Sequence, residues 1–141
     1  MDRTQGDGDT ELEKINVITE RIIGCAIEVH RVVCAVDCGM IVNPDTIEAQ
    51  VEGGIVFGLT AALHGKITIA DGRVVESNFG DYALVDMRGA PKVETFIVPS
   101  TERAGGIGET AVPPVAPAVA NALFKLTGKR IRRLPLSVQP V

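Results

Sequence analysis

The sequence is poor in aromatic side chains: its 141 residues include no tryptophan, one tyrosine and four phenylalanines. This excludes a core built on large rings, although the hydrophobic fraction of 45% is ordinary for a globular domain. The 15 glycines, together with many alanines and valines, indicate instead that helices and strands approach one another closely. The length predicts one domain.

An excess of basic charge is also absent, because the formal net charge is −4. Residues 1–28 hold this imbalance with seven acids and three bases, and residues 29–141 are neutral. The basic run over 125–133 has no aromatic residues between its charges, so we expect no nucleic-acid binding.

Cysteine and long apolar runs are scarce as well. The three cysteines are an odd number without a second pair or a nearby histidine, which argues against a disulfide framework and against a zinc site: Cys25, Cys34 and Cys38. Residues 1–10 are polar, with no apolar run after a basic start, and we interpret them as a disordered head without a signal peptide. No run reaches membrane-spanning length, so we expect no membrane span and a cytoplasmic location.

The hydrophobic pattern predicts an α+β fold. Residues 44–64 begin with a cap and a proline at Asn43–Pro44, repeat apolar residues every fourth position and end before Gly65, as a helix does. Asp71–Gly72 predicts a tight hairpin turn. We expect a small mixed or antiparallel sheet covered by two main helices, with an additional N-terminal helix. The expected strands are 31–37, 66–76 and 92–98, and the expected helices are 11–29, 44–64 and 114–127.

Two glycine-rich patterns raise the question of function. In "GGIGETAVPPVAPAVANALF" (105–124) the only charge is Glu109, placed between a glycine turn and a helix. Glu109 is either a common helix-start residue or a base held in a pocket. Within 44–64, Gln50, Gly54 and Gly58 recur every four residues. The glycines indicate either tight helix packing or the approach of a ligand.

Three stretches then occur in a specific order: "RVVCAVDCGMIVNPDTIEAQVEGGIVFGLTAAL", "SNFGDYALVDMRGAPKVETFIV" and "GGIGETAVPPVAPAVANALFKLTGKRIRRLPL". Together they resemble the C-terminal end of the molybdopterin-binding large subunit of the xanthine dehydrogenase and aldehyde oxidase family, and most of all its isoquinoline 1-oxidoreductase beta-subunit branch. The resemblance covers roughly residues 29–141 and implies that 31–141 is the C-terminal part of the second molybdopterin-binding domain.

The resemblance implies an oxidoreductase that uses a molybdenum–molybdopterin cofactor to hydroxylate aldehydes or N-heterocycles. It assigns the catalytic base to Glu109 and a cofactor hydrogen bond to Gln50. Gly54, Gly106 and Gly108 are expected where the backbone approaches the cofactor, and no metal ligand is expected from this chain. Family members usually have proline after the glutamate, where this chain has a threonine.

The family subunit is several times longer than this chain. We therefore expect two partners, the remainder of the molybdopterin-binding subunit and an iron–sulfur subunit, and no turnover by the chain alone. The alternative is a non-catalytic truncated or fused remnant, at most a small folding or association module that self-associates. In isolation we expect the chain to expose the glycine face of the helix over 44–64 and therefore to associate or to be poorly soluble. A glycine-loop phosphate binder ranks last, because no Lys follows "GGIGET".

The N-terminal part departs from the family. "ITERIIGCAIEVHR" (18–31) resembles the opening helix of the small GxxExxY protein family. We therefore interpret 11–30 as an appended helix. It arises either from a gene-level fusion or truncated reading frame, or as a lineage-specific extension of the N-terminus.

Overall fold

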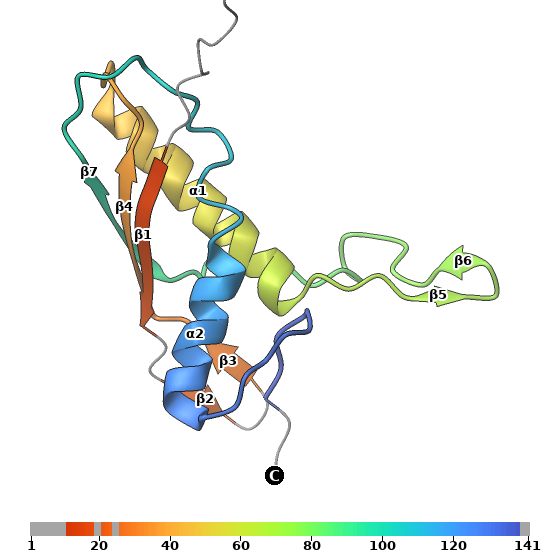
Figure 1. Cartoon of the computed structure of the whole chain (residues 1–141). Coiled ribbons are helices and arrows are strands. Elements are labelled where there is room, and N and C mark those ends of the chain that lie inside the picture. The colour runs from red at the N-terminus through yellow and green to blue at the C-terminus, as the bar shows by residue number, and fades with distance from the viewer. Residues whose placement is uncertain (1–10, 19–20, 24–25, 139–141) are drawn as a thin grey trace, which may run out of the picture.

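A three-stranded sheet forms one layer of the computed structural model, which describes residues 11–18, 21–23 and 26–138. Its strand order is β1 (Glu11–Ile18), β4 (Arg31–Asp37) and β7 (Lys92–Ile97) (Figure 1). β1 runs antiparallel to β4, with Ile15 opposite Cys34, and β7 runs parallel to β4, with Thr95 opposite Cys34. The sheet is therefore mixed, as predicted.

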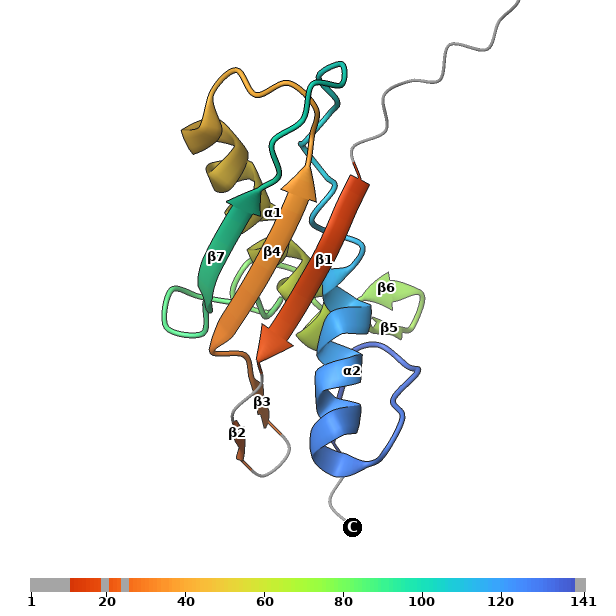
Figure 2. The same ribbon diagram turned by 60° about the vertical axis from the view of Figure 1, so that its left-hand side comes forward.

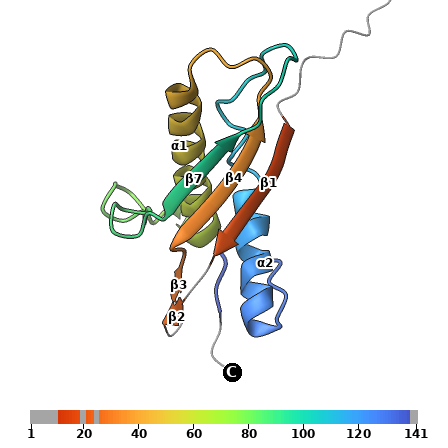
Figure 3. The same cartoon turned by 90° about the vertical axis from the view of Figure 1, so that its left-hand side faces the viewer.

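Both helices, α1 (Pro44–Leu63) and α2 (Val115–Thr127), pack on the same side of this sheet (Figures 1 and 3). Alternate β4 residues are buried toward them, as expected for a strand with one covered face. The largest fully buried side chains of the described residues come from β4 and the two helices: Val32, Cys34, Val36, Val51, Ile55, Leu59, Val115, Val119 and Leu123. The predicted α+β fold, with two helices covering a small sheet, is confirmed.

The ends of the helices follow the predicted signals. The Asn43 side chain accepts a hydrogen bond from the Thr46 N–H at 3.3 Å, and Pro44 occupies the first turn of α1. α2 ends at Gly128, whose φ of 69° is left-handed and whose N–H donates to the Phe124 carbonyl at 2.8 Å. Both boundaries lie within one residue of the prediction.

The expected N-terminal helix over 11–29 is wrong. This segment instead forms β1 and a small antiparallel pair, β2 (Arg21–Ile23) and β3 (Ala26–Glu28). Isoleucines and valines recur there at helical spacing, but these β-branched residues also suit a strand. Continuous pairing of Lys14–Ile18 with β4, and of Glu11 beyond an irregularity, decides between the two, and the sequence pattern does not show this pairing. The interpretation of 11–30 as an appended helix therefore fails, and the predicted disordered head lies outside the described residues.

The predicted hairpin forms at the predicted residues, but it is not part of the main sheet. β5 (Ile69–Ala70) and β6 (Arg73–Val74) flank Asp71 and Gly72, whose φ values of 50° and 73° fit the predicted turn. The hairpin forms a separate two-stranded sheet that projects from the body (Figures 1 and 2). The third strand of the main sheet is therefore β1 and not the predicted 66–76 segment.

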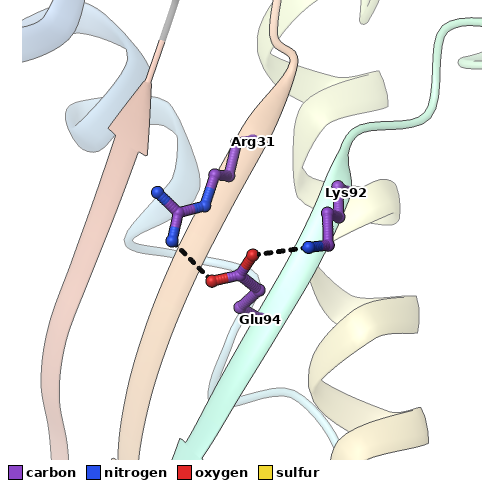
Figure 4. Close-up of polar contacts among 3 residues, drawn as sticks. All are labelled: Arg31, Lys92 and Glu94. Carbon is purple, nitrogen blue, oxygen red and sulfur yellow. Dashed lines mark hydrogen bonds and ion pairs between the residues drawn. The ribbon is translucent and has the colours of Figure 1, made fainter.

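Three charged side chains tie β4 to β7 (Figure 4). Glu94 accepts a hydrogen bond from the Arg31 guanidinium at 2.5 Å and forms an ion pair with Lys92 at 2.8 Å. The Arg31 bond, and then the Lys92 bond, lower the pKa of Glu94 to about 2. Stability from these contacts is therefore complete above pH 4.5 and is lost as the pH falls toward 2.

The end of β4 holds the glycine-rich loop in place. Gly39 has a φ of +72°, and a Cβ added to it would lie 2.2 Å from the Arg103 carbonyl oxygen. Around it, the Met40 N–H donates to the Glu102 carbonyl and the Gly105 N–H donates to the Cys38 carbonyl, both at 2.9 Å. These contacts fix the segment from which the chain continues toward Glu109.

Candidate functional site

A pocket of about 450 Å³ lies between α1 and the turn that precedes α2. It is lined by Gln50, Gly53, Gly54, Phe57, Gly108, Glu109, Val112 and Pro113. Four of the five predicted site residues therefore meet, although two come from α1 and two from the loop after β7. Gly106, the fifth, does not line the pocket.

The α1 side of the pocket combines an exposed amide with a buried backbone. Gln50 is exposed, whereas Gly54 is buried and its added Cβ would lie 3.1 Å from the Ala111 Cβ. At Gly58, an added Cβ would lie 2.9 Å from the Val112 carbonyl oxygen. Helix packing, one of the two explanations left open by the sequence, therefore accounts for both glycines.

Packing of these glycines also corrects an expectation about the free chain. The glycine face of this helix was expected to be exposed in isolation and to promote association. Gly54 and Gly58 are instead covered by the chain itself, and only Gly53 is exposed.

The Glu109 side of the pocket is built from turns. Glu109 is exposed, and its carbonyl accepts from the Val112 N–H at 2.9 Å. The carbonyl of Val112 in turn accepts from the Val115 N–H at 3.4 Å, where α2 begins. Glu109 therefore lies in the turns that precede α2 and not in the helix itself. The connection between Glu109 and α2 is thus a chain of turns.

Thr110 stands where the family usually has proline, and its hydroxyl makes a bond that proline cannot make. Its Oγ1 donates to the Gly106 carbonyl at 3.3 Å. This bond closes the glycine-rich segment across four residues and supports the backbone next to Glu109.

The two loop glycines differ from those of α1 in what surrounds them. An added Cβ at Gly106 or Gly108 would meet nothing within 4 Å, and neither residue has a left-handed φ. The fold of this chain alone therefore does not require glycine at either position.

Phe57 is a pocket residue that the sequence analysis missed. Its ring is 69% exposed and lines the pocket beside Gly53. Phe57 follows Gln50 by seven residues, or about two helical turns, so the spacing alone places both on one side of α1. That spacing is the signal that could have found it.

Neither of the two described cysteines lines the pocket, and Cys25 lies outside the described residues. Cys34 and Cys38 are buried and not joined in a disulfide, and burial raises the pKa of Cys34 to about 11, which makes it a poor nucleophile. Within the described part of the chain, no group of three or more His, Cys, Asp or Glu side chains is placed to hold a metal ion. No helix in that part is long and apolar enough to cross a membrane.

Comparison with known proteins places this chain in a family. A family model described as a molybdopterin cofactor-binding domain matches residues 23–91, which include α1 and Gln50. The beta subunit of isoquinoline 1-oxidoreductase from Brevundimonas diminuta is 38% identical over 110 residues, or 78% of this chain. The chain belongs to the molybdopterin-binding subunit family of xanthine dehydrogenase and aldehyde oxidase. This family membership confirms the resemblance seen in the sequence.

Solved structures show the same fold. Quinoline 2-oxidoreductase from Pseudomonas putida 86 matches with a TM-score of 0.70 at 24% identity, over 78% of this chain and 15% of its own, a likeness of fold alone. The Cu,Mo-CO dehydrogenase matches with a TM-score of 0.65 at 29% identity, over 77% of this chain and 15% of its own. The chain spans 14% of the length of the isoquinoline relative, which is named as one subunit of its enzyme.

Proposed function

We propose that this chain supplies the catalytic-base glutamate, Glu109, and part of the molybdopterin-binding surface of a molybdenum hydroxylase. The observation that supports the proposal is the pocket itself, which gathers Gln50, Gly54, Gly108 and Glu109 from α1 and the loop before α2. Because the chain spans 14% of its isoquinoline relative, the rest of the cofactor site belongs to another segment or another chain.

The residues of the pocket suit one edge of a pterin cofactor. Gln50 offers an amide that both donates and accepts hydrogen bonds, and Gly108 leaves open space beside the backbone where a bulky group fits. When bound, the cofactor supplies the oxidative hydroxylation of an electron-poor carbon. In this assignment Gln50 hydrogen-bonds the cofactor and Gly108 lets it approach the backbone, whereas Gly54 is covered by Ala111 and serves the packing of α1.

Glu109 is suited to hold and move a proton. A carboxylate acts as a general base when a rigid support keeps it within hydrogen-bond reach of the proton that it takes. Here the support is the turn closed by the Val112 N–H and the Thr110 bond to Gly106. Since both Gln50 and Glu109 are exposed in this chain, water must be excluded by the remaining segments.

The relatives narrow the substrate and the partners. The isoquinoline relative is named for an N-heterocycle, and a relative from Escherichia coli is named as an aldehyde oxidoreductase subunit, so the proposed substrates are N-heterocycles or aldehydes. The proposed partners are the remainder of the molybdopterin-binding subunit and an iron–sulfur subunit that accepts electrons. The dinucleotide form of the pterin is left open.

A non-catalytic association module is the second candidate. The observation that favours it is the exposure of Gln50 and Glu109 on a pocket that the chain alone leaves open. Such a module would keep the fold and the pocket without binding the cofactor.

Purification of the tagged full chain from its native host, grown with molybdate, separates these candidates. We expect stoichiometric molybdenum and pterin together with a large molybdopterin-binding polypeptide. Glu109→Gln should retain the molybdenum but lower hydroxylation of isoquinoline or an aldehyde by about 10²–10⁴-fold, as expected when a general base is lost.

Glu102→Gln is the matched control, because Glu102 is an exposed glutamate that lies outside the pocket. Its turnover should equal that of the unmodified chain. A folded chain that is recovered without molybdenum, pterin or a large partner would support the association module instead.

A further inference from the structure

The outer side of α1 is unusually apolar for a helix surface that faces solvent. Ala49, Gly53, Phe57 and Ala61 follow one another every four residues, and all four are exposed. A solvated helix face normally presents charged or polar side chains at such positions. The Phe57 ring, 69% exposed, is the largest side chain of this row.

A hollow of about 520 Å³ lies beside this row. Its opposite wall is formed by Tyr82, Leu84 and Val85, and Leu84 is 56% exposed. The Val85 N–H donates to the Thr60 Oγ1 at 3.2 Å, which attaches this wall to α1. We name the combined surface the α1 docking face; it consists of Ala49, Gly53, Phe57, Ala61, Tyr82 and Leu84.

The α1 docking face is continuous with the Glu109 pocket. Gly53 and Phe57 line both the pocket and the hollow, so one apolar surface extends from Glu109 along α1. Whatever covers Phe57 therefore also covers one side of the Glu109 pocket.

We infer that the α1 docking face receives an apolar segment from the remainder of the molybdopterin-binding subunit, which closes the Glu109 pocket as it docks. This inference rests on the proposed function, because the chain spans only 14% of its isoquinoline relative. An added Cβ at Gly53 would meet nothing within 4 Å, so the incoming backbone can approach α1 closely there.

The charges of α1 distinguish this occupant from a second copy of the chain. α1 contains Asp45, Glu48 and Glu52 but no lysine or arginine, and Glu52 lines the hollow. A symmetric dimer through this face would place the acidic helix against its own copy, with like charges opposed. The docked segment is therefore apolar with basic residues at its edge.

The experiment compares tagged full chains purified from the native host grown with molybdate. The variants are Phe57→Asp and Gly53→Leu on the α1 docking face, with Phe96→Asp as the control. Phe96 is 58% exposed on β7, away from both hollows. Mass spectrometry quantifies the recovered molybdopterin-binding polypeptide, metal analysis gives the molybdenum per chain, and circular dichroism with urea unfolding verifies the fold of each variant.

We expect Phe57→Asp and Gly53→Leu to lower both recovered quantities at least tenfold, and Phe96→Asp to lower them less than twofold. Recovery of the molybdopterin-binding polypeptide at an unchanged level with both face variants would overturn this inference and leave the proposed function standing. Recovery of neither molybdenum nor that polypeptide with the unmodified chain would instead refute the proposed function, and this inference with it. A chain that is dimeric until Phe57→Asp makes it monomeric would assign the face to a second copy and also overturn the inference.

Discussion

Five of the described glycines form two groups that differ in what an added side chain would meet. At Gly39, Gly54 and Gly58 an added Cβ would contact other atoms of the chain at 3.1 Å or less. At Gly53 and Gly108, both on the pocket that contains Glu109, it would meet nothing within 4 Å. Folding explains the first group. Folding does not explain the second group, and the proposed function assigns it to a cofactor or segment that approaches from outside the chain.

Gly39→Ala should show the largest effect in the first group. The residue has a φ of +72°, and the new Cβ would lie 2.2 Å from a backbone oxygen of Arg103, so the 100–105 segment must move. Left-handed strain and overpacking together predict a loss of about 3 kcal/mol in the free energy of unfolding, measured by urea denaturation.

Gly72→Ala provides the matched control for Gly39→Ala. Gly72 has almost the same φ, +73°, but an added Cβ there would meet nothing within 4 Å. It should therefore lose only the strain component, about 1 kcal/mol. Equal losses in the two variants would show that the contact with Arg103 does not contribute to the loss in stability. That result would contradict the division of the glycines into a packed and an open group.

Gly58→Ala and Gly53→Ala should change stability in opposite directions, although both glycines lie in α1. At Gly58 the new methyl group would lie 2.9 Å from the Val112 carbonyl oxygen, so overpacking exceeds the gain in helix propensity and the variant loses about 1 kcal/mol. At Gly53 only the gain in helix propensity remains, so the free energy of unfolding of this variant rises by up to about 1 kcal/mol. Thermal unfolding of both variants measures the two signs, and a loss at Gly53 would place that glycine in the first group.

Elements with strong local signals were predictable from the sequence. Asn43, Pro44 and the four-residue apolar repeat locate α1, and Asp71–Gly72 locates a turn with two left-handed residues. The N-terminal strand was not predictable in this way, because residues 11–18 have a pattern compatible with both helix and strand. Only their pairing with β4, more than a dozen residues away in sequence, decides the outcome.

The site was predictable only in part, and for a related reason. The resemblance predicts roles for Gln50 and Glu109, but that these two line one pocket depends on how α1 packs against the turn before α2. Helical spacing from Gln50 could have added Phe57. The position of Gly39 against Arg103 depends on a crossing of two loops that no local pattern reports.

Among these glycine variants, Gly108→Ala should change the free energy of unfolding least, but it should lower the amount of molybdenum bound per chain. The new methyl group meets no atom within 4 Å and strains no left-handed backbone, so the free energy of unfolding should change by less than about 0.5 kcal/mol. If a cofactor occupies the space beside Gly108, the same methyl group displaces it, and the molybdenum per chain purified from the native host should fall at least fivefold. Gly80→Ala is the control, since Gly80 is equally open but lies outside the pocket. An unchanged amount of molybdenum per chain in Gly108→Ala would show that nothing approaches this glycine closely. The two groups of glycines would then differ only in being packed or exposed to solvent.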